Sequence, residues 1–140
     1  MSFPHESTLS VRYRDTDSQG HLYFANYLVF ADEAMSAYWR ELGWGFEDMD
    51  SAPAYTFAVN ANVDYASECL AFDHIKVRVG FSRLGNSSAD TAFELHNQRS
   101  GEIAARGSFT HVFVDKQTRK SCPIPTFFRA AILARQSDLA

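Results

Sequence analysis

Two aspartates, Asp15 and Asp17, lie in a short polar segment directly before a stretch with helical spacing of apolar residues. The first turn of a helix offers backbone N–H groups without partners and the positive end of the helix dipole. A carboxylate beside such groups can act as a nucleophile or a base, while the N–H groups stabilise negative charge on a substrate oxygen. The segment therefore indicates acyl-transfer chemistry with Asp17 as the reacting group.

Each polar residue of this segment also has a structural interpretation. Aspartate is favoured in turns and helix caps, so Asp17 could serve only to shape the turn. Asp15 is expected to be structural, either through an ion pair with Arg12 or Arg14 or as a cap of the turn. His21 follows Asp17 closely, and a structural hydrogen bond is a more common role for a loop histidine than proton transfer.

The start of the predicted helix supplies the candidate donors to the substrate oxygen. These are the backbone N–H groups of Tyr23, Phe24 and Asn26, with that of Phe24 expected to be nearest. The two aromatic rings could equally pack in the core, which is the usual fate of aromatic residues at helical spacing, and this would not prevent donation by the backbone. A later segment, Val59, Asn60 and Ala61, is a candidate for lining the same pocket.

The elements that would position these residues follow from hydrophobic periodicity. Helical spacing of apolar residues runs from Phe24 to about Leu42, and the glycines at 43 and 45 end that helix. Apolar and polar residues alternate in further stretches, as half-buried strands do. These stretches predict strands at 8–13, 57–65, 75–82, 89–96 and 103–114, and a short helix is predicted at 127–135.

This order of elements predicts an α+β fold in one domain that spans residues 1–140. One long helix would be covered by a curved antiparallel sheet of about five strands, the last four pairing in succession, and residues 1–6 would form a tail. The segment Gly85–Ala89 nearly matches a nucleophile elbow, but its strand–turn–strand context favours a simple hairpin. Open sheet edges need protection, so a dimer is expected.

Composition and residue spacing disfavour three classes of protein: nucleic-acid-binding, membrane-spanning and metal-binding proteins. The 140 residues carry a net charge of −4, which disfavours binding to nucleic acid. No apolar run approaches the roughly 18–20 residues that span a membrane, so a membrane span is not expected. The four histidines other than His21 show no metal-ligand spacing with each other or with cysteine, so a metal site is not expected. Cys69 and Cys122 lie far apart, which favours free thiols and a cytoplasmic location over a disulfide.

The motif from Tyr13 to Tyr27, YRDTDSQGHLYFANY, resembles the hotdog-fold thioesterases of the 4-hydroxybenzoyl-CoA thioesterase type, and most closely their short-chain acyl-CoA thioesterase branch. Weaker matches follow in the expected order, at 63–65, 70–73, 85–88, 101–105, 114–115 and 123–125. The resemblance implies an antiparallel sheet wrapped around a helix, a homodimer or homotetramer with sites between subunits, and Asp17 as the catalytic carboxylate. Because the chain lacks the His-Gly-Gly signature of another branch, Glu33 is given no catalytic role. Some relatives carry histidine where Phe24 stands, which removes a possible helper in proton transfer.

The resemblance implies hydrolysis of a CoA or acyl-carrier-protein thioester without a metal or an organic cofactor. A thiolate leaves readily, because a thiol leaving group has a pKa near that of cysteine, about 8.5, so one carboxylate and backbone donors suffice. The alternative is a non-catalytic module of the same fold that binds acyl-CoA or an acyl carrier. A hydratase is a third possibility, but its Asp/His or Glu/His arrangement is not evident. The sequence does not distinguish aromatic from aliphatic acyl groups.

Overall fold

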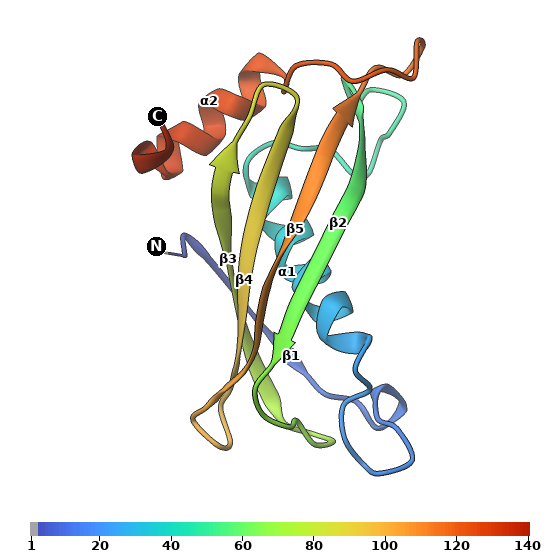
Figure 1. Cartoon of the computed structure of the whole chain (residues 1–140), viewed down its shortest axis with the longest axis vertical. Helices are drawn as coiled ribbons and strands as arrows, with labels where there is room; N and C mark the ends of the chain where they lie inside the picture. Colours follow the sequence, from blue (N-terminus) through green and yellow to red (C-terminus); the bar gives the residue numbers. More distant parts are fainter. Residues whose placement is uncertain (1–2) are drawn as a thin grey trace.

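Five antiparallel strands curve around one long helix, α1, and a short helix, α2, closes one end (Figure 1). The computed structural model describes residues 3–140. The elements in chain order are β1 (His5–Ser10), the 3₁₀ turn η1 (Tyr13–Asp15), α1 (Asn26–Glu41), β2 (Tyr55–Tyr65), β3 (His74–Leu84), β4 (Ser88–Asn97), β5 (Ile103–Val114), α2 (Thr126–Arg135) and the 3₁₀ turn η2 (Ser137–Leu139). The predicted α+β class, the central helix and the five strands are confirmed.

The order of strands across the sheet is β1-β3-β4-β5-β2, so the predicted pairing in succession is only partly right. Strands β3, β4 and β5 pair in sequence order, but β2 pairs with β5 instead of β3. The reason is that β1 occupies the free edge of β3. Strand β2 therefore forms the opposite edge of the sheet, and residues 66–73 carry the chain back across to β3.

The first strand lies further toward the N-terminus than predicted. His5 and Glu6 belong to β1 instead of a tail, and the Glu6 carboxylate accepts a hydrogen bond of 2.9 Å from Arg78 on β3. The strand ends at Ser10 instead of Tyr13, because the chain turns at Arg12, whose backbone N–H donates to the side chain of Asp15. The alternating pattern that predicted a longer strand thus continues into a turn.

The core lies between α1 and the concave face of the sheet. Seven residues of α1 are buried there, at helical spacing, as the sequence predicted for the helix as a whole: Tyr27, Phe30, Ala31, Ala34, Met35, Tyr38 and Trp39. Trp39 occupies the centre of an aromatic cluster, with ring centroids of neighbours at 5.1–6.4 Å; these neighbours are Trp44, Phe46, Phe81, His111, Phe113 and Phe128. Because Phe128 comes from α2, the short helix completes the core.

Gln136, at the end of α2, joins that helix to the sheet. Its side chain is buried and pairs with the backbone of Phe81, accepting from the N–H at 2.9 Å and donating to the C=O at 2.8 Å. The same Gln136 oxygen accepts a hydrogen bond of 3.0 Å from the hydroxyl of Tyr38 on α1. One amide side chain thus connects both helices to β3.

Gln136→Ala should lower the free energy of unfolding by about 3 kcal/mol, because it leaves buried polar groups of Phe81 and Tyr38 without partners. Urea denaturation followed by circular dichroism measures this loss. Gln98→Ala removes an exposed glutamine and should change the free energy of unfolding by less than about 0.5 kcal/mol. Equal effects of the two substitutions would contradict the bridging role.

Neither helix within residues 3–140 combines the length and the apolar character that a membrane crossing requires. The two cysteines form no disulfide: Cys69 is buried, and Cys122 is partly buried elsewhere in the fold.

Candidate functional site

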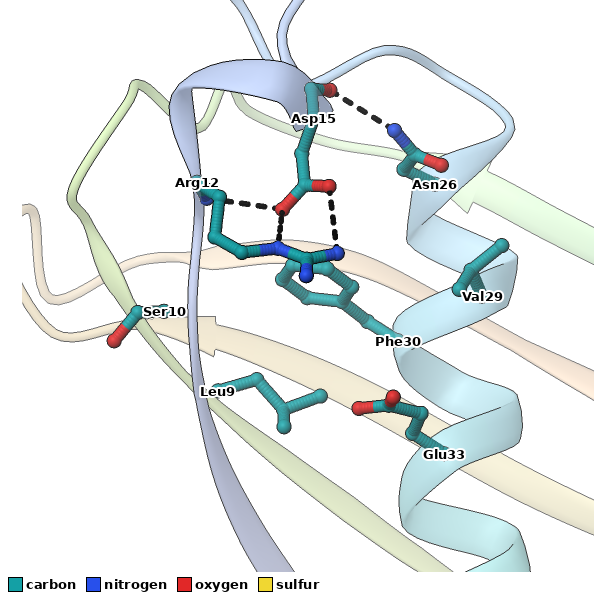
Figure 2. A pocket seen from close by; sticks show the side chains of 8 residues that line it. All are labelled: Leu9, Ser10, Arg12, Asp15, Asn26, Val29, Phe30 and Glu33. Atoms are coloured by element: carbon teal, nitrogen blue, oxygen red, sulfur yellow. Dashed lines mark hydrogen bonds and ion pairs between the residues drawn. The ribbon is translucent and has the colours of Figure 1, made fainter.

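The segment between β1 and α1 begins with a turn that Asp15 fixes (Figure 2). The Arg12 guanidinium donates two hydrogen bonds of 3.1 Å to the carboxylate of Asp15, and the backbone N–H of Arg12 adds a third at 2.9 Å. These bonds hold the pKa of Asp15 below its usual value, with the Arg12 side chain as the main cause. The carbonyl of Asp15 accepts from the Asn26 side chain at 2.9 Å. The structural role predicted for Asp15 is confirmed.

Asp17 lies in the next turn and uses one carboxylate oxygen to shape it. Oδ1 accepts hydrogen bonds from the backbone N–H groups of Gln19 (2.9 Å) and His21 (3.2 Å). Gly20, with φ of +80°, allows the chain to close this turn, since its N–H donates to the Asp17 carbonyl at 3.1 Å. The side chain is partly exposed, and within residues 3–140 its Oδ2 atom makes no hydrogen bond. The geometry thus accommodates the turn-forming role and leaves one oxygen available.

Helix α1 begins without a side-chain cap. It starts at Asn26 instead of Phe24, and the residue before it is Ala25, which has no capping group. Within the described residues, the N–H groups of Phe24, Ala25 and Tyr27 donate to no acceptor. Unpaired amides at the positive end of a helix can stabilise an anion.

Two of the three predicted donors are already engaged. The N–H of Tyr23 donates to the Asp15 carbonyl at 2.9 Å, and that of Asn26 donates to the Tyr23 carbonyl at 2.8 Å. Among the described residues, only the Phe24 amide of the predicted set donates to no acceptor. The Asn26 side chain instead helps to fix the preceding turn.

The rings of Tyr23 and Phe24 lie on the surface instead of in the core. They are 45% and 60% exposed, and their centroids are 4.7 Å apart. The carbonyl of Phe24 accepts a hydrogen bond of 2.7 Å from the hydroxyl of Tyr65, the last residue of β2. This end of the edge strand therefore lies beside the helix start, and two aromatic side chains are available for contact with a ligand.

The third predicted group, Val59–Ala61, does not meet Asp17 within one chain. These residues are exposed on β2 at a bulge, and six positions separate Val59 from Tyr65, which corresponds to roughly 20 Å along a strand. Asn60 and Ala61 also point to opposite faces of the sheet, since side chains alternate along a strand. A common pocket would need a second copy of the chain.

A groove of about 330 Å³ lies between β1 and the start of α1 (Figure 2). Its lining comprises Leu9, Ser10, Arg12, Asp15, Asn26, Val29, Phe30 and Glu33. Asn26 is the one predicted site residue among them, and Asp17 lies outside this groove. No trio of His, Cys, Asp or Glu side chains in residues 3–140 is arranged to hold a metal ion.

His21 does not pair its ring with Asp17. The ring Nε2 lies 2.8 Å from the carboxylate of Glu68, while the backbone of His21 forms the turn with Asp17. His21 and Leu70 also form an isolated antiparallel bridge. The structural role weighed for His21 matches this geometry.

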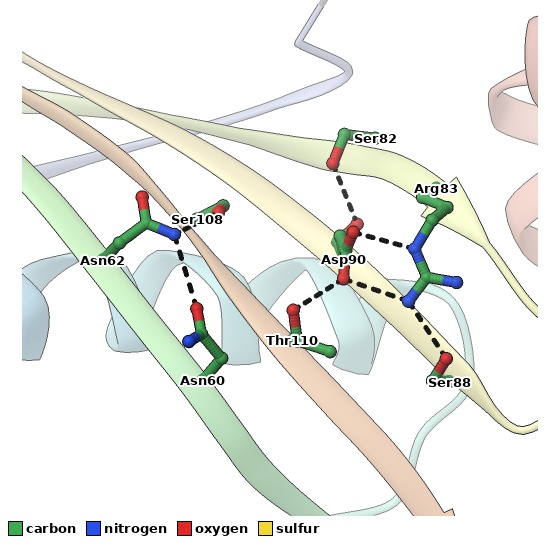
Figure 3. A network of polar contacts seen from close by, with 8 residues as sticks. All are labelled: Asn60, Asn62, Ser82, Arg83, Ser88, Asp90, Ser108 and Thr110. Carbon is green, nitrogen blue, oxygen red and sulfur yellow. Dashed lines mark hydrogen bonds and ion pairs between the residues drawn. The ribbon is translucent and has the colours of Figure 1, made fainter.

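The segment Gly85–Ser87 connects β3 to β4, so the elbow-like sequence is a hairpin as predicted. The hydroxyl of Ser88 accepts a hydrogen bond of 3.0 Å from Arg83, which also pairs with Asp90 at 2.8 Å (Figure 3). Thr110 on β5 donates to the same carboxylate at 2.7 Å. Within the described residues, this network holds Ser88 in a structural role.

Comparison with known proteins identifies relatives that are similar to this chain in sequence and in structure. Residues 11–132 match the family model of the "Thioesterase-like superfamily". The chain is 27% identical to the Bacillus subtilis protein YneP, to which an acyl-CoA thioesterase activity is attributed, over 88% of this chain and 86% of YneP. It is 26% identical to a 1,4-dihydroxy-2-naphthoyl-CoA hydrolase of Nostoc punctiforme, over 89% of this chain and 82% of that enzyme. A crystal structure of a Thermus thermophilus thioesterase complexed with coenzyme A and zinc superposes with a TM-score of 0.84 and 26% identity, covering 96% of each chain.

Proposed function

Since this chain belongs to the thioesterase-like superfamily, we propose that it hydrolyses an acyl-CoA thioester to a free acid and coenzyme A, with Asp17 as the reacting carboxylate. The observation that carries the proposal is that Asp17, whose second carboxylate oxygen makes no hydrogen bond within residues 3–140, lies in the turn that precedes the uncapped start of α1. The CoA complex of the Thermus thermophilus relative supports CoA as the thiol component.

The chemistry needs no more than these groups. In one route, Asp17 attacks the thioester carbonyl, the C–S bond breaks and a mixed anhydride forms, which water then hydrolyses. In the other route, Asp17 removes a proton from water as the water attacks the carbonyl. In both routes the amides of Phe24 and Ala25 stabilise the negative charge on the carbonyl oxygen. The thiolate of CoA departs without a strong acid, because thiols are weakly acidic groups, with a pKa of about 8.5 for that of cysteine.

The complete site would form in a homodimer joined through β2. This strand is an edge with unpaired backbone groups, and it exposes the apolar side chains of Phe57, Val59 and Tyr65. Antiparallel pairing of two copies could place Val59 of one copy opposite Tyr65 of the other. That register brings Val59–Ala61 to the helix start of the second copy. A homotetramer would be a further assembly of such dimers.

Val59→Asp should convert the dimer to a monomer in sedimentation velocity and lower kcat/KM at least about 10-fold. The reason is that a carboxylate within the paired strands would be buried without a partner. Met49→Asp, in the loop before β2, places the same charge on an exposed apolar residue away from the edge and should leave both measurements unchanged. A Val59→Asp protein that sediments like the wild type would contradict pairing through β2.

A panel of acyl-CoA substrates tests the activity itself. Straight-chain and aromatic acyl-CoA thioesters are incubated with the protein, and the released thiol is measured. The Nostoc relative acts on an aromatic acyl-CoA, and the exposed rings of Tyr23 and Phe24 could stack on such a group, so aromatic substrates should give the highest kcat/KM. Binding of every substrate without release of thiol would refute hydrolysis and favour an acyl-CoA-binding module.

We also propose a cytoplasmic location, which the free thiols of Cys69 and Cys122 support.

A further inference from the structure

The loop that carries Asp17 is held at both of its ends by one short segment, residues 69–73. At the first end, the Val11 N–H donates to the Asp73 carbonyl at 2.9 Å, and the Phe72 N–H donates to the Val11 carbonyl at 2.7 Å. At the other end, the Leu22 N–H donates to the Cys69 carbonyl at 2.8 Å. The position of Asp17 therefore depends on the conformation of this segment.

The segment itself is fixed by the carboxylate of Asp73, which is 5% exposed. Its Oδ2 atom accepts hydrogen bonds from the Leu70 N–H at 2.8 Å and from the Asn97 side chain at 2.9 Å. Its Oδ1 atom accepts from the Arg99 guanidinium at 2.8 Å. The bond to Leu70 closes a tight turn in which Phe72 adopts a left-handed φ of +71°, a costly conformation for a phenylalanine. Without the carboxylate, this turn would lose the interaction that balances its strain.

The Asp73 carboxylate is ionised in this environment. Burial acts to raise its pKa, but hydrogen bonds from Arg99, Leu70 and Asn97 outweigh burial, and the net pKa lies below the usual value. Asn97 is also buried, and its side-chain oxygen accepts from the Arg99 N–H at 2.9 Å. Asp73, Asn97 and Arg99 thus form one connected set, which we name the brace.

We propose that Asp73 is a positioning residue for the reaction, and that the brace holds Asp17 and the helix-start amides in their reactive arrangement. This inference rests on the proposed function. Catalytic groups that shift by about 1 Å can lose about 100-fold in rate, so loosening the loop should lower kcat more than substrate binding.

The test is Asp73→Asn in the full chain, with the best substrate of the panel, well below the melting temperature of every variant. The new amide nitrogen must face a donor of Asn97, Leu70 or Arg99, so the brace is broken at nearly constant volume. We expect kcat to fall at least 10-fold with KM within about two-fold of wild type. Amide hydrogen exchange should be faster in residues 17–22.

Asp90→Asn is the matched control. Asp90 also accepts hydrogen bonds from an arginine and from an uncharged side chain, but it lies in the network of β3, β4 and β5 shown in Figure 3. Its substitution should reduce stability while kcat and exchange at 17–22 stay unchanged. If Asp73→Asn keeps kcat within two-fold of wild type, the proposal is overturned.

Two further outcomes need their own tests: an Asp73→Asn protein that does not fold, and a wild-type protein without thioesterase activity. Should Asp73→Asn fail to fold, Arg99→Gln removes only the exposed member of the brace and should lower kcat about three-fold with unchanged KM; no loss of kcat would overturn the proposal. A wild-type protein that hydrolyses no thioester would refute the proposed function. In that case, amide hydrogen exchange in residues 17–22 tests the brace alone. Unchanged exchange in Asp73→Asn would refute the role of the brace in fixing the loop that carries Asp17, and faster exchange would support that role.

Discussion

Asp17→Asn should lower kcat for thioester hydrolysis at least about 1,000-fold, which corresponds to about 4 kcal/mol of transition-state stabilisation. Asparagine keeps an oxygen that can accept from the N–H groups of Gln19 and His21, so the turn should persist. It removes the negative charge required of a nucleophile or a base. Steady-state kinetics measure the loss, and isothermal titration with a non-hydrolysable acyl-CoA analogue should show binding within a few-fold of wild type.

Asp115→Asn provides a closely matched control. The Oδ1 atom of Asp115 also accepts two backbone hydrogen bonds in a turn, from Gln117 at 2.9 Å and Thr118 at 2.8 Å. That turn follows β5, away from the start of α1. Its substitution should therefore leave kcat unchanged. Asp17→Asn activity within a few-fold of wild type would exclude Asp17 as the reacting group.

The largest loss of stability is expected from Trp39→Ala, at about 4 kcal/mol of the free energy of unfolding. Trp39 is almost completely buried and contacts aromatic rings from α2, the sheet and the loop after α1. Alanine would leave a cavity where elements distant in sequence meet, and a domain of this size has only about 5–15 kcal/mol of stability. Urea denaturation at constant protein concentration measures the change.

Phe127→Ala is the control, because it removes an aromatic ring from the margin of the cluster instead of from its centre. Phe127 is about half exposed and stacks on Trp44 at the margin of the cluster, with a centroid distance of 6.3 Å. Its substitution should cost about 1 kcal/mol or less. Similar losses from the two substitutions would show that Trp39 has no central role in the core.

Periodicity predicted the elements well where the pattern was strong. Strand β5 has the predicted bounds, Ile103–Val114, and α1 differs by about two residues at its start. The pairing of β2 was the main error in topology. Alternation reports which face of a strand is buried but not which strand lies beside it, and β2 meets β5 only because β1 takes the edge of β3.

Within the site, local contacts were predictable and distant ones were not. Arg12 and Asp15 stand three residues apart, so their pairing could be read from the sequence. His21 instead meets Glu68, and Asp73 meets Asn97 and Arg99, across separations that no local pattern encodes. Helical spacing allows a core position for Phe24, but the helix begins two positions later and the ring of Phe24 is exposed.

The pairing of β2 with β5 also has a consequence during synthesis of the chain on the ribosome. Tyr65 ends β2 and Ile103 begins its partner β5, so nearly forty residues are added between them. At roughly 5–20 residues per second, β2 waits several seconds before its partner is complete. Asn60, Asn62 and Asp64 interrupt its apolar residues, as gatekeepers do in strands that must stay unpaired without aggregating. The polar side chains of this strand are therefore expected to limit aggregation of the nascent chain until β5 is synthesised.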